Sequence, residues 1–373
     1  MGHTADIVVV GAGPVGAVVA RLCAERLGWK VQVLDRRSHV AGNCHDRPHK
    51  SGVLVHAYGP HYFRTDDKNI IDYLSEFTEW IPGNYIVRSS VGGTLYPFPV
   101  NLTTLEMFFK RPLTQRQARA HLNALASKFE EPANAEEYVL SRLGRDLYEK
   151  FYRGYTMKQW GRHPRELLPE VCGRIPIRLD RVETYVDHRY QLTPKAGFTA
   201  MFAKMLAHPN IQVTLGVDFL KTRKVFKAGR ALLYTGPIDE YFEFRLGALP
   251  WRSFKIDFKE YKREWKQPCV QINYPNERGY TRSVEIKHVT GQKHPRTVVS
   301  FETPSGTGEP YYPMPLPEAR RLYLRYQGLA EKETRERKTY FAGRQATYRY
   351  INTDEAIESA FEIFERIKRE RAA

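Results

Sequence analysis

The most constraining feature of this chain is a strand, a glycine-rich turn, a helix and a second strand that together end at Asp35. The β-branched run 7–10, IVVV, leads into GAGPVG, then into the helical stretch AVVARLCAERLG and the strand VQVLD. A continuous apolar strand of this kind is typical of a strand buried on both faces of a sheet. The order of the elements predicts a Rossmann-like α/β fold that binds a dinucleotide.

Each glycine of this turn has a predicted task. Gly11 permits the tight turn, Gly13 lets backbone amides approach a pyrophosphate, and Gly16 lets the helix pack close to the strand. The N-terminus of the helix then faces the phosphates. Asp35 follows Gly16 by 19 residues and can accept a hydrogen bond from a ribose hydroxyl. These four residues form the predicted core of a cofactor site.

A second turn favours FAD over a nicotinamide dinucleotide. Directly after Asp35 comes RRSHVAGNCHD, in which Ala41, Gly42 and Asn43 form another turn that exposes its backbone. Flavoproteins with this fold use such a turn against FAD, whereas nicotinamide dehydrogenases do not need it. We therefore add Gly42 and Asn43 to the predicted cofactor-binding residues.

Length and composition predict a globular protein with more than one domain. A chain of 373 residues is longer than a single hydrophobic core usually serves. Apolar residues make up 42%, and no run approaches the roughly 18 apolar residues of a membrane helix. The apolar start continues straight into glycines, which indicates a first strand and not a signal peptide. The four cysteines form no CxxC pair, so we expect no metal site, no disulfide framework and a cytoplasmic location.

The net charge of +16 is the least specific signal in the chain. An excess of this size attracts polyanions, acidic lipids or phosphorylated small molecules. No nucleic-acid module and no continuous basic stripe accompany it, so we do not expect nucleic acid as the partner. A phosphorylated small molecule remains compatible with it.

Beyond the first strands, the chain alternates between helical and strand-like patterns. Residues 104–168 have helical periodicity, whereas 177–191 and 242–302 contain strand-like runs broken by Gly, Pro and Asn. The region 85–100 predicts a hairpin that turns at Gly92 and Gly93.

Helix and strand patterns then return twice, so the nucleotide-binding fold is expected to be discontinuous. We predict FAD-binding segments at 1–80, 195–241 and 313–373, antiparallel β-sheet segments at 81–102, 177–194 and 242–312, and an inserted helical substrate domain at 103–176.

The segment FYRGYTMKQWG, residues 151–161, is unusually aromatic and cationic. If it is helical, Tyr152, Tyr155, Thr156 and Trp160 lie three or four residues apart and form one stripe. Such a stripe is either part of the core or a platform on which a nucleobase stacks. The pattern alone leaves both readings open.

Two arginines from separate segments are candidates for holding a diphosphate. Arg174 lies in EVCGRIPIR and Arg282 lies in NERGYTRS. Charge-assisted bonds from two guanidinium groups suit a diphosphate. The alternative is that both form ordinary surface ion pairs, in a chain with 58 basic residues.

Several of these motifs, taken together, resemble the bacterial UDP-galactopyranose mutases. The resemblance runs nearly end to end, through GAGPVG, AGNC, YGPHYF, FPVNL, GYTMKQWG, RIPIR, IDEYFEFRLGALPWRS, YTR, EPYYP and FAGRQATYRY. It implies an FAD protein that interconverts UDP-galactopyranose and UDP-galactofuranose, the latter for cell wall polysaccharide. It also implies that the aromatic stripe is a uridine platform.

The resemblance assigns roles to individual residues. It implies that Tyr155 stacks on uracil and that Trp160 is the gate residue of a mobile loop on which Arg174 also lies. Arg174 and Arg282 would hold the two phosphates, while His61 would lie by the flavin and complete the catalytic set. The further implied contacts are Phe151, Tyr152, Thr156, Tyr185, Asn273, Tyr312, Tyr350 and Asn352 for the substrate, with Arg344 and again Tyr350 for the cofactor.

The implied chemistry rests on the cofactor. N5 of reduced FAD forms a covalent adduct with the anomeric carbon of the sugar and UDP leaves. The ring then opens and recloses through the 4-hydroxyl, and UDP returns to the anomeric carbon as the flavin is released. The resemblance implies activity only with reduced flavin, with NAD(P)H or another external reductant, in a homodimer or higher homo-oligomer.

Three positions depart from the commonest pattern of the family. Tyr85 stands where many members have Asn, Arg64 replaces a second His, and Asn352 replaces an Asp, although Asn352 could simply cap the last helix. Two alternatives follow. One is a mutase of the same mechanism for UDP-N-acetylgalactosamine or a dTDP-linked hexose, and the other is an FAD-dependent oxidoreductase of the amine-oxidase type.

Overall fold

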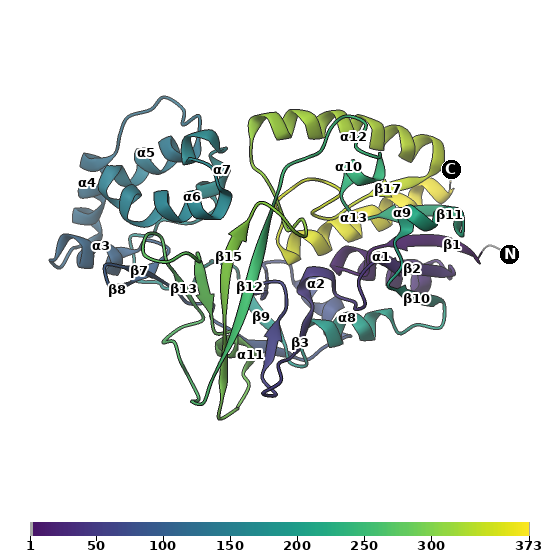
Figure 1. Cartoon of the computed structure of the whole chain (residues 1–373), viewed down its shortest axis with the longest axis horizontal. Helices are drawn as coiled ribbons and strands as arrows, with labels where there is room; N and C mark the ends of the chain where they lie inside the picture. Colours follow the sequence, from purple (N-terminus) through teal and green to yellow (C-terminus); the bar gives the residue numbers. More distant parts are fainter. Residues whose placement is uncertain (1–2, 373) are drawn as a thin grey trace.

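The glycine-rich turn follows the first strand of a five-stranded parallel sheet, which is built from separate segments of the chain (Figure 1). The computed structural model describes residues 3–372. The strand order is β10-β2-β1-β11-β17, and every neighbouring pair is parallel. The strands are β1 (His3–Val10), β2 (Val31–Asp35), β10 (Ile211–Leu215), β11 (Phe226–Tyr234) and β17 (Thr339–Phe341). The predicted Rossmann-like α/β class is confirmed.

Helix α1 (Pro14–Arg26) is enclosed by this sheet and by two other helices. It contacts β1 and β2 as well as α8 (Phe198–Leu206) and α13 (Thr353–Ala372), although these helices are far apart in the sequence. Its residues are buried on every side, from Val15 through Ala24 with few exceptions. A helix covered on nearly every side is expected to be almost wholly apolar, as AVVARLCA is apart from the partly exposed Arg21. The remaining helices of this half are α2 (Lys68–Ser75), α9 (Phe219–Thr222), α10 (Ile238–Tyr241) and α12 (Pro317–Arg337).

A seven-stranded sheet forms the middle of the molecule. Its order is β16-β12-β15-β14-β13-β7-β8. All its pairs are antiparallel except β13 with β7, which run parallel. The hairpin predicted around Gly92 and Gly93 is confirmed, since β7 and β8 pair directly across it. The strands are β7 (Val87–Val91), β8 (Thr94–Phe98), β12 (Trp251–Tyr261), β13 (Gln271–Asn273), β14 (Arg282–Val284), β15 (Thr297–Ser305) and β16 (Tyr312–Pro313).

The prediction of strand structure over 177–191 is mostly wrong. Only β9 (Tyr190–Pro194) forms there, in a three-stranded sheet with β5 (Phe63–Thr65) and β6 (Trp80–Pro82). The preceding segment is instead held by the buried side chain of Arg178, which donates to the carbonyl of Thr184 at 2.8 Å and to the carboxylate of Asp187. The Arg178 side chain and one isolated bridge between Thr184 and Ile86 thus take the place of a strand ladder. A separate two-stranded ladder joins β3 (Asp46–Pro48) to β4 (Leu54–His56).

A group of helices covers the β7–β8 end of the middle sheet, at the left of Figure 1. Their starts are well capped: the side chains of Asn101, Thr114 and Asn134 each accept from a backbone N–H in the first turn. The helices are α3 (Leu102–Phe109), α4 (Gln115–Leu125), α5 (Ala135–Leu147), a π-helical turn (Tyr148–Arg153), α6 (Gly154–Trp160), a 3-10 turn (Pro164–Glu166) and α7 (Glu170–Gly173). The helical periodicity of 104–168 is therefore confirmed. The grouping of segments into domains stays a prediction.

Residues 3–372 contain neither a candidate membrane-spanning helix nor a candidate metal site. No helix in this range is both long and apolar enough to cross a membrane. No group of three or more His, Cys, Asp or Glu side chains in the same range is arranged to hold a metal ion. The four cysteines are buried and unpaired as thiols.

Candidate functional site

Two cavities meet inside the molecule and share part of their walls. The first cavity follows the carboxyl ends of β1, β2 and β11 and contains the glycine-rich turn. The second cavity, of about 590 Å³, lies between the helical group and the middle sheet. His61, Arg344, Asn352 and Thr353 line both of them. A ligand in one cavity would therefore lie directly beside a ligand in the other.

The glycines of the first cavity are required by close backbone contacts. A Cβ on Gly16 would lie 1.9 Å from the carbonyl oxygen of Gly11, so no side chain fits there. The second turn abuts the first, because a Cβ on Gly42 would lie 3.0 Å from the Cα of Gly13. No side chain caps the start of α1 and no acidic residue lies in its first turn. Its free backbone amides are suited to phosphate oxygens.

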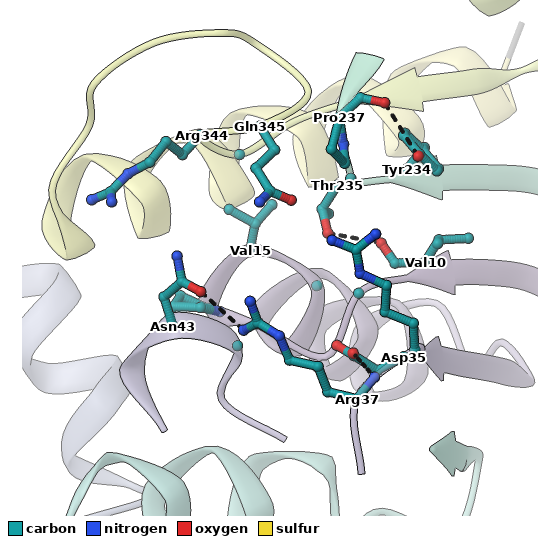
Figure 2. Close-up of a pocket in the computed structure, with 18 of the residues that line it drawn as sticks. Val10, Val15, Asp35, Arg37, Asn43, Tyr234, Thr235, Pro237, Arg344 and Gln345 are labelled. Atoms are coloured by element: carbon teal, nitrogen blue, oxygen red, sulfur yellow. Dashed lines mark hydrogen bonds between the residues drawn. The ribbon is translucent and has the colours of Figure 1, made fainter. Parts of the chain in front are cut away.

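Asp35 organises the floor of the first cavity (Figure 2). One of its carboxylate oxygens accepts from the backbone N–H of Ala12 at 2.8 Å, and the other accepts from the N–H of Arg37 at 2.8 Å. Each oxygen retains a lone pair for a ribose hydroxyl. Arg37 donates onward to the side chain of Asn43 at 2.9 Å and lies over the ring of Tyr58. The sequence reasoning missed Arg37, although the basic pair after Asp35 was a visible signal.

These features fit an adenine dinucleotide. Free amides at a helix start face the cavity, a carboxylate suits a ribose, and two glycine turns leave room for a pyrophosphate. The predicted cofactor residues Gly11, Gly13, Gly16, Asp35, Gly42, Asn43, His61 and Arg344 all line this cavity. Tyr350 does not; it lines the second cavity.

His61, at the junction, is fixed as a neutral ring. Its Nδ1 lies 2.9 Å from the carbonyl oxygen of Gly59, and because a carbonyl only accepts, Nδ1 carries the proton. Nε2 is then an acceptor. Burial, with His56 and Arg344 adding to it, lowers the pKa of His61 to about 3. At neutral pH the ring can accept a hydrogen bond but is not a cation.

The aromatic segment 151–161 lines the second cavity, and Phe151, Tyr152 and Trp160 are at the same time buried in a hydrophobic core. It is not a regular α-helix, because a π-helical turn covers its first residues before α6 begins. Tyr96 and Phe98 pack against Phe151 and Tyr152 with ring centroids 5.2 and 5.8 Å apart, which holds these two rings in place. The residues of the segment that line the cavity are Phe151, Tyr152, Tyr155, Thr156, Gln159 and Trp160.

Helix α6 is tied to the loop that connects β13 and β14. A Cβ on Gly154 would lie 2.4 Å from Asn276 and 2.5 Å from the carbonyl of Pro275, so only glycine permits this approach. The ammonium group of Lys158 donates to three carbonyls of the loop, those of Tyr274, Arg278 and Tyr280. The sequence reasoning did not identify Lys158, because its partners lie more than a hundred residues away.

Arg174 and Arg282 both reach the second cavity, but their surroundings differ. The guanidinium carbon of Arg174 lies 3.5 Å from the centroid of the Tyr350 ring, and no carboxylate within residues 3–372 pairs with it. Arg282 donates through two nitrogens to one oxygen of Glu302, at 2.7 and 2.6 Å, and Glu302 is completely buried. Neither arginine forms the ordinary surface ion pair that the alternative reading required.

Three tyrosines, Tyr185, Tyr312 and Tyr350, line the cavity beside these arginines. Tyr312 stacks on Tyr350 with ring centroids 4.9 Å apart. Burial acts to raise the pKa of Tyr350, but the guanidinium groups of Arg174, Arg344 and Arg282 outweigh it and lower the pKa to about 8. A site that favours a phenolate to this extent has a strongly positive potential, which suits a diphosphate. The neighbouring Tyr311 is absent from the lining.

Asn352 lines both cavities but does not cap α13 in the expected way. Its side-chain nitrogen and its backbone N–H both donate to one oxygen of Glu355, at 2.9 and 2.7 Å. Glu355 in the first turn therefore acts as the cap. The amide donors of Asn352 favour this reversed arrangement, since they suit a carboxylate acceptor.

The structure also brings charged residues to the second cavity that the sequence reasoning had not assigned. Arg64, one of the three departures, donates to the hydroxyl of Tyr62 at 2.8 Å. His188 and Asp354 lie 4.0 Å apart nearby. Burial raises the pKa of Asp354, an effect that Arg64 opposes. These residues come from β5, the loop before β9 and the start of α13, so no local motif marks them.

Comparisons with known proteins agree with this geometry. Residues 150–350 match the family described as UDP-galactopyranose mutase, and residues 9–77 match an NAD(P)-binding Rossmann-like domain. A Klebsiella pneumoniae protein described as a probable UDP-galactopyranose mutase is 35% identical, over 95% of this chain and 92% of its own. The dTDP-fucopyranose mutase of Escherichia coli is 34% identical, over 95% and 96%.

A solved structure extends the likeness to the whole fold. The crystal structure of a reduced UDP-galactopyranose mutase superposes with a TM-score of 0.79, covering 97% of this chain and 95% of that one, at 16% identity. At this identity it supports the fold alone. From the family match and the full-length relatives, the chain belongs to the UDP-galactopyranose mutase family.

Proposed function

We propose that the chain is a UDP-galactopyranose mutase, an isomerase that interconverts UDP-galactopyranose and UDP-galactofuranose with reduced FAD as its cofactor. The observation that carries the proposal is the shared wall between a dinucleotide cavity and a second, cation-rich cavity, at His61 and Arg344. This arrangement would bring a nucleotide-linked sugar to the end of the cofactor. The full-length relatives with mutase names support the same reading.

The first cavity would hold FAD through its backbone turns and Asp35. The amides at the start of α1 would bind the pyrophosphate, and Asp35 would accept from the ribose. When bound and reduced, the flavin supplies a nucleophilic nitrogen for the anomeric carbon of the sugar. His61, neutral and with Nε2 as an acceptor, can receive a hydrogen bond from a group bound at the junction.

The second cavity would bind the nucleotide and stabilise the charge that grows when the diphosphate departs. The rings of Phe151, Tyr152 and Tyr155 would hold the uracil, and Arg174 and Arg282 would bind the phosphates. Within residues 3–372 no carboxylate neutralises Arg174, so its charge is shared with Tyr350 and with the ligand. The same two arginines would keep UDP in place for its return to the sugar.

Exclusion of water is the remaining task of the chain. Trp160 lies 6.2 Å from Tyr350 and 6.4 Å from Tyr312, ring centroid to ring centroid, and so covers the phosphate end. We propose that the segment carrying Trp160 and Arg174 opens to admit the substrate and closes during turnover. A closed cavity would protect the reacting sugar from hydrolysis.

A dTDP-linked hexose is the second candidate substrate. The dTDP-fucopyranose mutase is nearly as similar to this chain as the Klebsiella relative is, and it covers as much of the chain. The departures at Arg64, Tyr85 and Asn352 all line the second cavity, which is where a change of substrate would be accommodated.

The test is chromatography of nucleotide sugars after incubation of the FAD-loaded protein with UDP-galactofuranose, with and without dithionite. We expect UDP-galactopyranose to form only in the reduced sample. Parallel incubations with a dTDP-linked furanose separate the two candidate substrates. Turnover by oxidised flavin with consumption of oxygen would instead indicate an oxidoreductase. NAD(P)H is the proposed reductant in place of dithionite, and a homo-oligomer is the proposed assembly.

A further inference from the structure

Tyr85, Gln271 and Asn273 form a chain of buried hydrogen bonds at the second cavity. The hydroxyl of Tyr85 donates to the side-chain oxygen of Gln271 at 2.8 Å. The side-chain nitrogen of Gln271 donates to the side-chain oxygen of Asn273 at 2.7 Å. The three residues are only 3, 5 and 5% exposed, and all three line the cavity. The hydroxyl of Tyr85, both side-chain polar atoms of Gln271 and the side-chain oxygen of Asn273 are thus paired with one another.

The fold brings the three residues together through a parallel strand pair. Gln271 is in register with Val87, and its backbone N–H donates to the carbonyl of Ile86 at 3.3 Å, so Tyr85 lies just before this pairing. Gln271 and Asn273 are two residues apart on β13 and therefore point to the same face. No local motif could reveal this arrangement.

The ring of Tyr85 is held firmly. It stacks on Tyr62 with centroids 4.4 Å apart and an angle of 16° between the planes, and it packs against Tyr185 at 6.2 Å. Burial raises the pKa of its hydroxyl well above 10, although Arg282 opposes the shift. The hydroxyl therefore keeps its proton at neutral pH and can donate it to Gln271.

The direction of each bond fixes the next amide. Because the oxygen of Gln271 accepts from Tyr85, its nitrogen is left to donate to Asn273. Because the oxygen of Asn273 is occupied, the nitrogen of Asn273 is the group left for a ligand. Within residues 3–372 this nitrogen has no protein partner. It is also not completely buried, so a ligand in the cavity can reach it.

Asn273 also lies beside the groups that would bind a nucleotide. In the β13–β14 pairing it is directly opposite Arg282. The charge of Arg282 acts on the hydroxyl of Tyr155, so the aromatic platform is close by as well. The free donor of Asn273 is therefore at the nucleotide end of the cavity.

We propose that Tyr85 and Gln271 are positioning residues that orient Asn273 so that its side-chain nitrogen donates to an oxygen of the nucleoside. The ligand group is an acceptor on the pyrimidine or the ribose. The inference rests on the proposed function, since it requires a nucleotide in this cavity. It gives Tyr85, one of the three departures from the family pattern, a role at the nucleotide.

The first test is Tyr85→Phe in the full-length, FAD-loaded protein, with the Kd of UDP measured by calorimetry. Loss of the hydroxyl leaves the buried oxygen of Gln271 without a donor, so the amides are free to reorient. We expect the Kd of UDP to rise about 5- to 10-fold, as for the loss of one buried hydrogen bond. The value of kcat at saturating substrate should stay within about twofold, because the chemistry does not use this amide.

Tyr148→Phe is the matched control. Tyr148 is fully buried, its hydroxyl has no hydrogen-bond partner among residues 3–372, and it does not line the cavity. Removal of that hydroxyl should leave the Kd of UDP unchanged. An equal loss in both variants would overturn the proposal, because it would mark a general effect of altering a buried tyrosine.

A double-mutant cycle separates positioning from simple stability. Gln271→Leu should weaken UDP about as much as Tyr85→Phe, and the double variant should be no weaker than either. Additive losses would show that the two side chains act independently. A fall in kcat with an unchanged Kd would also contradict the proposal, since it would place Tyr85 at the chemistry.

Nucleotide analogues identify the acceptor. If the penalty of Tyr85→Phe vanishes with 2′-deoxy-UDP, the acceptor is the ribose 2′ oxygen. If it vanishes with CDP, the acceptor is the O4 carbonyl of uracil. If it persists with both, another oxygen of the nucleoside is bound, as proposed.

Because binding is measured without turnover, wild-type protein that binds no nucleotide refutes the proposed function, whereas binding unaffected by Tyr85→Phe refutes only the positioning role.

Discussion

The two cavities are built in opposite ways. The first cavity is made chiefly of backbone: glycine turns and the start of a helix, with one carboxylate that is itself held by backbone N–H groups. The second is made of side chains that come from the helical group, the middle sheet and the last helix. A backbone site depends on a few residues that are close in the sequence. A side-chain site depends on many residues that the fold must bring together.

Adding even a methyl group at Gly16 should prevent the first cavity from binding its cofactor. In Gly16→Ala the new methyl group would lie 1.9 Å from the backbone oxygen of Gly11, which cannot move without opening the turn. We expect purified protein without bound flavin and with a lower Tm, measured by the absorbance spectrum and by calorimetry. Gly328→Ala on α12, where a Cβ meets nothing within 4 Å, should retain both. A yellow Gly16→Ala protein would contradict the backbone account.

The arginines of the second cavity should differ in what their loss does to the fold. Arg282→Met leaves the buried carboxylate of Glu302 without a partner, so we expect the free energy of unfolding to fall by about 3–5 kcal/mol. Affinity for UDP should fall as well. Arg174→Met should weaken UDP about 10- to 100-fold, as for a lost charge-assisted bond, with little change in unfolding.

A second substitution sharpens this contrast. Arg282→Met combined with Glu302→Gln should recover most of the stability, measured by denaturant unfolding, without recovering affinity for UDP. Equal destabilisation by the two single arginine variants would contradict the difference in their surroundings.

Lys158 should have a smaller effect, through position alone. Lys158→Met removes the bonds that tie α6 to the β13–β14 loop, so we expect the KM for the nucleotide sugar to rise about tenfold with a modest fall in kcat. Lys158→Arg should restore part of the loss. Lys150→Met is the control, since its ammonium group lies over Tyr96 and Phe108, and its bond to the loop, from Asn276, is accepted by the backbone carbonyl that the substitution keeps. Equal effects of the two methionine variants would remove the special role of Lys158.

The smallest expected effect is a pH dependence of nucleotide binding. Below its pKa of about 8, Tyr350 is neutral and can donate to a phosphate; above it, a phenolate faces the diphosphate. Affinity for UDP should be constant at lower pH and fall several-fold as pH rises through 8. Binding should take up a proton in that range, and Tyr350→Phe should abolish the decline.

Lys158 could produce a similar decline, because burial lowers its pKa to about 8 as well. The Lys158→Arg background keeps a cation at that position across the range. If the decline persists in Lys158→Arg and disappears in Tyr350→Phe, Tyr350 is its source. The reverse result would assign it to Lys158.

The contrast between the cavities explains what the sequence could predict. The backbone site was readable because its glycines and Asp35 fall within one short stretch and each spacing has a physical reason. In the second cavity, the aromatic stripe and the two arginines were candidates from their pattern, and the family resemblance added the other predicted contacts. The structure brings them together around one space. Their roles as ligand contacts stay predictions. Only the structure showed that the aromatic stripe lines a cavity.

What the sequence could not predict depends on distant partners. Lys158 has its acceptors in a loop that is far along the chain, and Glu302 is recognisable only once β14 and β15 pair. The π-helical turn at Tyr148–Arg153 has the same hydrophobic pattern as an α-helix. The segment before β9 looked like a strand, since the buried hydrogen bonds of Arg178 leave no mark on local periodicity.

The common wall of the two cavities has a thermodynamic consequence. His61 and Arg344 line both cavities, so under the proposed function an added electron pair on the flavin would alter the binding free energy of the neighbouring nucleotide. Linkage makes the effect reciprocal: a nucleotide that prefers the reduced protein raises the midpoint potential of the flavin by a corresponding amount. The substrate would thereby help to set the oxidation state on which its own conversion depends.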